Sequence, residues 1–232
     1  MARHIGILAC SFEGAALCYR TIGLDAEPLM GTYDHPHITI DNVPMAAMLP
    51  YFERRDYDGL GSLMAESAER LRAAGATFGI CPDNSCHLAF DRMQSLTTLP
   101  FLHIADEVAR QIADGGYRCA GILGTRYTMS SSLYADALNR VGVAAISPEE
   151  DAQAYVQEAI FGELVKGVLR DETRRGFRAA IEGLAQLGCD CVVLGCTEIP
   201  LIVDPASSPL PTFDSTRILA RAALRHALAD GG

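Results

Sequence analysis

Short apolar segments alternate with longer amphipathic segments along this chain, and this alternation restricts the fold more than any other feature. Residues 4–10 ("HIGILAC"), 36–41 and 77–82 have strand character, whereas 13–26 and 57–75 carry apolar residues at helical spacing. Strands that are joined by helices run parallel in one sheet. The pattern therefore predicts an α/β fold with a mostly parallel sheet flanked by helices.

The second half of the chain repeats the pattern. Strands are expected at 118–125, 143–148 and 189–196, and helices at 101–116, 131–142, 150–169, 171–188 and 212–230. Asp171 is expected to cap one helix, and Asp214 or Ser215 the last. The repeat predicts two pseudo-symmetric lobes with an active site in the cleft between them.

Two proline-containing segments, 97–102 ("TTLPFL") and 207–214 ("SSPLPTFD"), are expected to cross between the lobes. The first lobe is then residues 1–98 together with a C-terminal helix at 210–232. The second lobe is residues 99–209.

Length and charge exclude several classes of function. The chain has 232 residues and a formal net charge of −10, without the basic cluster that a nucleic-acid surface needs. No apolar run has the length of a membrane span, and Glu13 interrupts the apolar N-terminus, which favours a first strand over a signal peptide. We expect a cytoplasmic protein whose eight cysteines stay reduced.

Residue counts also bear on cofactors. Of the 19 basic residues only Lys166 is a lysine, and no glycine-rich phosphate loop lies beside it, so a pyridoxal phosphate enzyme is not expected. A metal site could be formed by Cys81, Cys86, His87, Cys189 and Cys191. The spacing of these residues matches no standard zinc pattern. We therefore expect neither a cofactor nor a metal.

Two polar turns follow apolar strands at equivalent places in the repeat. Asp83-Asn84-Ser85 and Cys196-Thr197-Glu198 begin 113 residues apart (196 − 83). Ligands bind at the carboxyl ends of parallel strands, where both turns are expected to lie. A helical turn starting at Cys196 would favour its thiolate and make it a base or a nucleophile, although strand cysteines are often inert.

The first turn leaves several alternatives open. Asp83 is either a catalytic carboxylate or the cap of the next turn. Asn84, Ser85 and Thr197 are neutral donors that suit a substrate carboxylate. His87 either shuttles protons or makes a local hydrogen bond.

Two further stretches are candidates for binding. Thr125 and Thr128 follow a strand in "GILGTRYTMSS" (121–131), where they either line a site or cap a turn. Lys166 is either a positioned ammonium or a solvated helix residue.

Taken together, these motifs resemble the aspartate/glutamate racemase family, which is also called the aspartate/hydantoin racemase superfamily. The resemblance covers nearly the whole chain. It is carried by "IGIL", "HPHITIDNVP", "ERLRAAGATFGICPDNSCH", "GILGTRYTM", "LVKGVLRDETR", "GCDCVVLGCTEIPLIV" and "LPTFDST".

The resemblance implies a cofactor-independent reaction in which two opposed cysteines remove and return the α-proton of an amino acid. Here Asp83 stands where the first family cysteine would be, and Cys196 carries over. The resemblance also implies a homodimer and a small carboxylate substrate, with aspartate or glutamate as the leading class. The resemblance implies substrate-binding roles for Ser11, Asn84, Ser85, Thr125, Thr128, Lys166 and Thr197. It implies a possible proton relay through His87 and Glu198.

The exchange of Asp for Cys leaves other reactions open. The reference pKa values of Cys and Asp are about 8.5 and about 3.9, so the two groups are mismatched as partners that swap roles. A decarboxylase needs only one proton donor, on the Cys196 side. A cis-trans isomerase of a small dicarboxylate that uses Cys196, and a non-catalytic ligand-binding homologue, are further alternatives.

Overall fold

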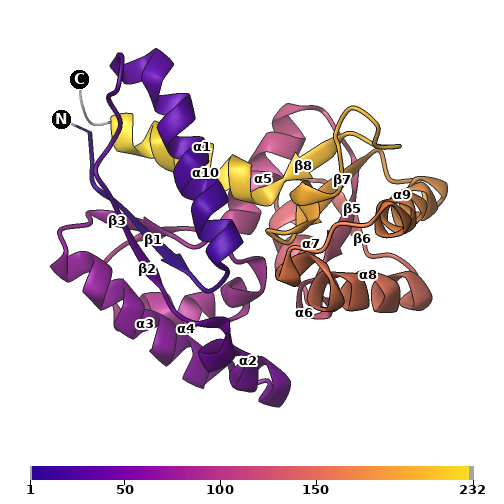
Figure 1. Cartoon of the computed structure of the whole chain (residues 1–232), viewed down its shortest axis with the longest axis horizontal. Helices are drawn as coiled ribbons and strands as arrows, with labels where there is room; N and C mark the ends of the chain where they lie inside the picture. Colours follow the sequence, from indigo (N-terminus) through magenta and orange to yellow (C-terminus); the bar gives the residue numbers. More distant parts are fainter. Residues whose placement is uncertain (1, 230–232) are drawn as a thin grey trace. The chain divides into compact units, whose positions relative to one another are not determined.

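The computed structural model describes residues 2–229 and divides into two compact units. Unit 1 comprises the chain up to residue 107 and from residue 216 onwards, and unit 2 comprises residues 108–215. Each unit contains one four-stranded sheet, and all strand pairs are parallel. The predicted α/β fold with two parallel sheets flanked by helices is confirmed (Figure 1).

Unit 1 is built on a sheet with the strand order β2-β1-β3-β4. Its elements are β1 (Ile5–Ala9), α1 (Phe12–Met30), β2 (Ile38–Asn42), α2 (Met45–Arg54), α3 (Tyr57–Ala73), β3 (Phe78–Ile80), the 3-10 helix η1 (Asn84–Ala89), α4 (Phe90–Leu96), β4 (Phe101–Leu102) and the closing α10 (Ser215–Leu228). Helix α5 (Ile104–Asp114) contains the boundary between the units.

Apolar side chains of unit 1 hold helices against both faces of this sheet. One core joins β1 and β3 to the inner faces of α1 and α10, through residues such as Ile7, Ile22 and Leu219. On the other face Gly6 lies against Leu71 of α3, at a distance that leaves little room for a side chain. Loops extend from the carboxyl ends of β1, β2 and β3.

Unit 2 repeats the topology with the strand order β6-β5-β7-β8. Its elements are β5 (Cys119–Gly124), α6 (Arg126–Met129), α7 (Leu133–Asn139), β6 (Ala144–Ile146), α8 (Glu150–Gly162), the 3-10 helix η2 (Leu164–Lys166), α9 (Asp171–Gln186), β7 (Cys191–Gly195), the 3-10 helix η3 (Ile199–Leu201) and β8 (Thr212–Asp214). Helices α8 and α9 share one core with β5 and β7, in which Phe177 and Leu184 are fully buried.

The segments expected to cross between lobes each contain a short strand. Residues 101–102 form β4 beside β3, and residues 212–214 form β8 beside β7. A proline precedes each strand, and its carbonyl accepts a hydrogen bond from the neighbouring strand: Gly79 N–H to Pro100 and Val192 N–H to Pro211. The expected lobe boundaries at 98/99 and 209/210 stay predictions, and the two compact units divide after residues 107 and 215.

Some predicted helix limits also differ. Asp171 is the first residue of α9 and makes no capping hydrogen bond from its side chain, because the N-cap position belongs to Arg170. The helix expected at 150–169 stops at Gly162, and Lys166 belongs to η2. The last helix ends at Leu228, and Asp230 lies outside the described residues.

None of the helices in residues 2–229 combines the length and the apolar character that a bilayer crossing requires.

The glycines of unit 2 give a matched test of this packing. Gly124→Ala would place a Cβ 2.7 Å from the Gly195 carbonyl oxygen on the neighbouring strand, whereas a Cβ at Gly183 of α9 would meet nothing within 4 Å. We expect Gly124→Ala to lower the free energy of unfolding by about 1–3 kcal/mol through overpacking. Gly183→Ala should raise it by about 0.5–1 kcal/mol, because alanine favours the helix. Urea denaturation of the two variants measures both effects, and equal changes would contradict the packing described.

Candidate active site

Asp83 lies just beyond β3, and its carboxylate is fixed by the turn that follows β1. Its Oδ2 accepts the backbone N–H of Cys10 at 2.8 Å, and its Oδ1 accepts that of Ser11 at 3.1 Å. The side chain is 8% exposed. Asp83 is at the N-cap position of η1, yet its side chain makes no capping bond there. The two N–H donors therefore link the segment after β3 to the segment after β1, its neighbour in the sheet.

The buried side chain of His87 stabilises the loop after β3 that contains Asp83. Its Nε2 donates to the carbonyl of Cys81 at 2.9 Å, so the chain between them, including Asp83, is held as a loop. Burial, and then the nearby His103, lower the pKa of His87 to about 3. His87 therefore stays neutral across physiological pH, and its ring N–H already donates to a carbonyl. Both properties suit the local hydrogen-bonding role. The geometry gives no support to the alternative of a proton shuttle.

Two cysteines next to Asp83, Cys10 and Cys86, do not resemble reactive thiols. The Sγ atoms of Cys10 and Cys86 are 3.9 Å apart. The hydrogen bond with Cys86 lowers the pKa of Cys10, but burial and the charge of Asp83 outweigh it and raise the pKa to about 12. Hydrogen bonds with Cys10 and Cys81, together with burial, raise the pKa of Cys86 well above its ordinary value. At neutral pH Cys10 and Cys86 are therefore protonated.

The equivalent strand end of unit 2 carries a compact group of three polar side chains. Cys196 follows β7 directly, and its Sγ lies 3.0 Å from Oε2 of Glu198. The same Oε2 accepts the hydroxyl of Thr197 at 2.7 Å. All three side chains are buried, with exposed fractions of 8%, 3% and 3% for Cys196, Thr197 and Glu198. The thiol therefore has a carboxylate within proton-transfer distance.

The helical turn expected at Cys196 is much shorter than an α-helix. Only η3, a three-residue 3-10 helix, follows, and its N-cap is Glu198. A dipole of this length offers little stabilisation to a thiolate at residue 196. The expectation that a helical turn begins at Cys196 is wrong, because η3 begins only at Ile199, three residues further along the chain.

The end of β7, directly before Cys196, is closely packed. Gly195 and Gly124 are paired on neighbouring strands, and added Cβ atoms would meet backbone oxygens at 2.9 and 2.7 Å. Ser215 donates its hydroxyl to the Leu194 carbonyl at 2.8 Å. The phenol of Tyr134 bonds to Ser215, and burial raises its pKa well above the ordinary value. These contacts fix the end of β7 and hence the position of the thiol.

Thr125 and Thr128 lie at the end of the adjacent strand β5. Thr125 is the N-cap of α6, and its hydroxyl accepts the backbone N–H of Thr128 at 3.4 Å. The two hydroxyl oxygens are 3.5 Å apart, and both residues are buried. The turn-cap role expected for Thr125 is confirmed. The hydroxyl pair also lies at the carboxyl edge of the sheet, on the strand beside Cys196.

The structure brings the predicted residues together in two groups, one in each unit. In unit 1 the backbone of Ser11 binds Asp83, and Asn84 and Ser85 follow directly in η1. In unit 2 the turn at Thr125–Thr128 and the Cys196–Glu198 group follow paired strands. Lys166 is an exposed residue at the end of η2 and does not lie on an α-helix.

Sequence reasoning missed three contributors. The Cys10 N–H contributes only its backbone, and Tyr134 and Ser215 act through each other on the Leu194 carbonyl. The one sequence signal for these contributors is their position along the chain, since Cys10 directly follows β1 and Ser215 directly follows β8. Among residues 2–229, no three His, Cys, Asp or Glu side chains are grouped so that they could hold a metal ion.

The sequence matches the family described as Asp/Glu/Hydantoin racemase over residues 7–223, a span that includes both strand-end groups. A relative from Bacillus subtilis, the broad specificity amino-acid racemase RacX, is 26% identical over 198 residues, which are 84% of each chain.

Solved structures give the same assignment. The crystal structure of a protein from Yersinia pestis that is provisionally assigned as an Asp/Glu racemase superposes with a TM-score of 0.88 at 31% identity, covering 97% of this chain and 99% of that one. An aspartate racemase homologue from Pyrococcus horikoshii gives 0.83 at 27% identity, with coverages of 98% and 99%. This chain therefore belongs to the Asp/Glu/hydantoin racemase family.

Proposed function

We propose that this protein is a cofactor-independent racemase that inverts amino acids at Cα. The observation that carries the proposal is the contact between the Cys196 thiol and the Glu198 carboxylate at the end of β7. Inversion at Cα requires a group that can both take and give a proton close to the reacting carbon. A buried thiol that shares a proton with a carboxylate meets this requirement.

Glu198 gives the thiol a place to put its proton. The Cys196 thiol lies in hydrogen-bond contact with the Glu198 carboxylate at 3.0 Å, so Glu198 is proposed as the acceptor of the thiol proton. When the proton is on Glu198, the Cys196 thiolate can remove the α-hydrogen of the substrate. When it is on Cys196, the thiol can donate to the planar carbanion. Thr197 donates to the same carboxylate oxygen and steadies it.

Asp83 is the candidate for the opposite proton transfer. Its two oxygens accept one N–H each, and a carboxylate has further lone pairs with which to accept a proton. A carboxylate and a thiol have different reference pKa values, so the two groups are inequivalent partners in proton transfer. The two directions of racemisation would then depend differently on pH.

Neutral donors are proposed to hold the α-carboxylate of the substrate. The hydroxyls of Thr125 and Thr128 meet at the end of β5, one strand from Cys196. Asn84, Ser85 and Thr197 add donors at the ends of β3 and β7, and Ser11 and Lys166 are retained as contributors from the family resemblance. In this proposal hydroxyl and amide groups supply most of the donors for the substrate, and Lys166 supplies a cation.

The wider setting is part of the proposal. A cytoplasmic location is favoured by eight free cysteines, including close pairs at 3.9 Å (Cys10 and Cys86) and 3.8 Å (Cys119 and Cys189), which an oxidising compartment would tend to join. A homodimer and independence from pyridoxal phosphate follow from the family resemblance. The decarboxylase, the cis-trans isomerase and the non-catalytic homologue are less favoured, because the relatives compared above are named for racemases.

Cys196→Ser should lower racemase activity by about 10²- to 10⁴-fold, because a hydroxyl is a far weaker acid and base than a thiol at this position. Circular dichroism of each amino acid over time measures inversion. Cys119→Ser, which alters a partly exposed thiol at the start of β5, is the matched control and should keep its activity. Equal losses in the two variants would contradict the assignment of Cys196.

Glu198→Gln should keep the fold but lower kcat by about 10- to 100-fold, since a charge-assisted hydrogen bond contributes about 1.5–3 kcal/mol. The matched control is Glu163→Gln, because Glu163 also accepts a threonine hydroxyl, that of Thr173, at 2.5 Å. A pH profile that is the same for Glu198→Gln and the parent enzyme would show that Glu198 takes no part in proton transfer.

Asp83→Asn should abolish inversion but leave solvent exchange of the α-hydrogen from one enantiomer, catalysed by Cys196. It should also lower the free energy of unfolding by about 1–3 kcal/mol, because an amide group would face an N–H donor. Asp56→Asn is the control for stability, since Asp56 likewise accepts a backbone N–H, that of Gly59, at 2.8 Å.

Asp83→Cys should restore a symmetric pair of thiols and bring the pH profiles of the two directions closer together. Racemisation that persists unchanged in both directions in Asp83→Asn would leave Asp83 only the role of holding the turn after β1.

A further inference from the structure

The amino end of the sheet in unit 2 carries two cysteines that take no part in the candidate site. Cys119 is the first residue of β5, and Cys189 lies shortly before β7. Their Sγ atoms are 3.8 Å apart. Cys196 follows the opposite end of β7. Because a disulfide has an S–S length of about 2.05 Å, a small movement of the two side chains would bring the sulfurs within bonding distance.

Backbone contacts already hold the two segments together. The Asp190 N–H donates to the Cys119 carbonyl at 2.9 Å, and the Asp190 carboxylate accepts the N–H groups of Arg118 and Cys119 at 2.9 and 3.0 Å. The Cys189 N–H donates to the Leu184 carbonyl of α9 at 3.1 Å. These bonds do not involve the sulfurs, so a disulfide could form without displacing the backbone.

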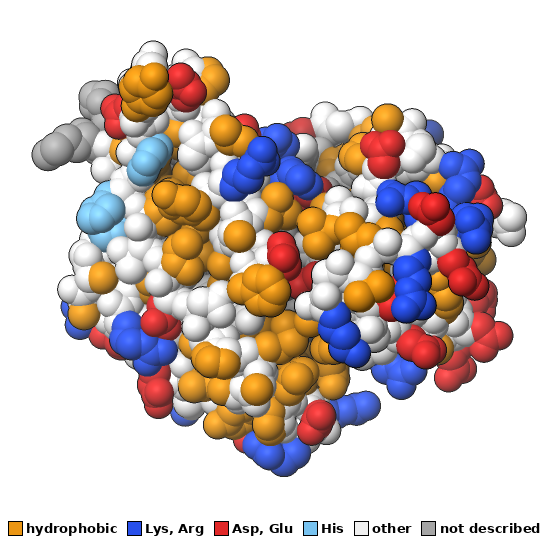
Figure 2. All heavy atoms as spheres, in the orientation of Figure 1, with side chains coloured by type: hydrophobic (Ala, Val, Ile, Leu, Met, Phe, Trp, Pro, Cys, Tyr) orange, Lys and Arg blue, Asp and Glu red, His pale blue; other side chains and the backbone are white. Residues whose placement is uncertain are grey.

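The two thiols differ in their exposure to solvent. Cys119 is partly exposed, whereas Cys189 is 5% exposed. Burial, followed by the hydrogen bond with Cys119, raises the pKa of Cys189 to about 12, so this thiol stays protonated at neutral pH. Figure 2 shows charged side chains spread over the visible surface of unit 2, a surface that small polar oxidants can contact. Such an oxidant would meet Cys119 before Cys189.

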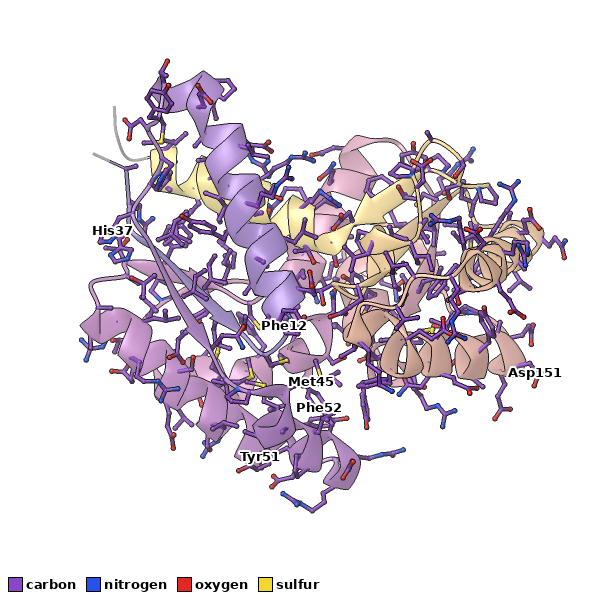
Figure 3. The ribbon with its side chains drawn as sticks, in the orientation of Figure 1. Phe12, His37, Met45, Tyr51, Phe52 and Asp151 are labelled. Carbon is purple, nitrogen blue, oxygen red and sulfur yellow. The ribbon has the colours of Figure 1, made fainter. Side chains whose placement is uncertain are left out.

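A third cysteine lies nearby without joining the pair. The Cys191 thiol donates to the carbonyl oxygen of Cys119 at 3.9 Å, and its side chain is fully buried. Cys189 instead belongs to the core that α8 and α9 share with the sheet, and Cys119 packs against that core. Figure 3 shows the side chains around these two helices, with sulfur in yellow. Cys191 therefore offers a matched control for Cys189.

We propose that Cys119 and Cys189 form a modification site at which a peroxide converts two thiols into one intramolecular disulfide. The Cys119 thiolate attacks an oxygen of hydrogen peroxide, the O–O bond breaks, and the released hydroxide takes up a proton to become water. The Cys189 sulfur then attacks the resulting sulfenic acid. The S–S bond forms, the S–O bond breaks, and the Cys189 proton leaves in a second water molecule. The two electrons lost by the sulfurs reduce the peroxide.

The disulfide would fasten the segment after α9 to the start of β5. It would close a loop across 70 positions of the chain (189 − 119), and thiol reductants would open it again. We expect the Tm of the oxidised protein to rise by about 5 °C or more, because the cross-link restricts the unfolded chain. The inference does not depend on the proposed racemase function, since neither thiol belongs to the candidate site.

The test is peptide mapping of the full chain after treatment with hydrogen peroxide. The remaining thiols are blocked with N-ethylmaleimide before the protein is unfolded and digested with trypsin. Residues 119–126 form a tryptic peptide with Cys119 as its one cysteine. We expect this peptide to be joined to residues 179–217, with a mass two hydrogen atoms below the sum of the two. Fragmentation of the joined peptide then locates the bond among Cys189, Cys191 and Cys196.

Two serine variants check the assignment. Cys189→Ser should abolish the joined peptide and the rise in Tm, whereas Cys191→Ser should keep both. Dithiothreitol should reverse the change in the parent protein. A parent protein that forms no joined peptide would overturn the proposal. It would also be overturned by fragmentation that places the bond on Cys191 or Cys196, or by a joined peptide that persists in Cys189→Ser.

Discussion

The bond between the Asp83 carboxylate and two backbone N–H groups organises the end of unit 1 at which a ligand would bind. It spans more than seventy residues of sequence and joins the loop after β3 to the loop after β1. Strand pairing brings the two loops near each other, and the carboxylate then fixes their separation. The same two bonds occupy the N–H donors of Cys10 and Ser11. One pair of hydrogen bonds thus sets both the geometry of this edge and the position of its buried carboxylate.

Unit 2 also carries a polar group at the end of a strand, but different contacts hold that group in place. Its strand-end thiol is held from below by close glycine packing and by the Tyr134–Ser215 pair, which leaves the side chain of Cys196 to meet Glu198. Two sheets with the same strand order therefore support different groups at equivalent strand ends. In one unit a carboxylate is tied to the backbone. In the other a carboxylate is tied to a thiol.

Much of the fold could be predicted because long helices such as α3 and α9 have enough residues to show a hydrophobic period. The strands β4 and β8 could not, since two or three residues carry no measurable period and only their pairing defines them. The positions of Asp83 and Cys196 at strand ends followed from the repeated pattern. Their partners did not. Backbone N–H groups have no sequence signature, and the path of the chain around η3 decides whether Glu198 turns towards the thiol.

The carboxylate oxygen of Glu198 that accepts both the Cys196 thiol and the Thr197 hydroxyl has a further consequence. One oxygen atom therefore ties the side chains of three consecutive residues into a single buried unit. A substitution at Thr197 or Glu198 would change the surroundings of the thiol without touching the strand that carries it.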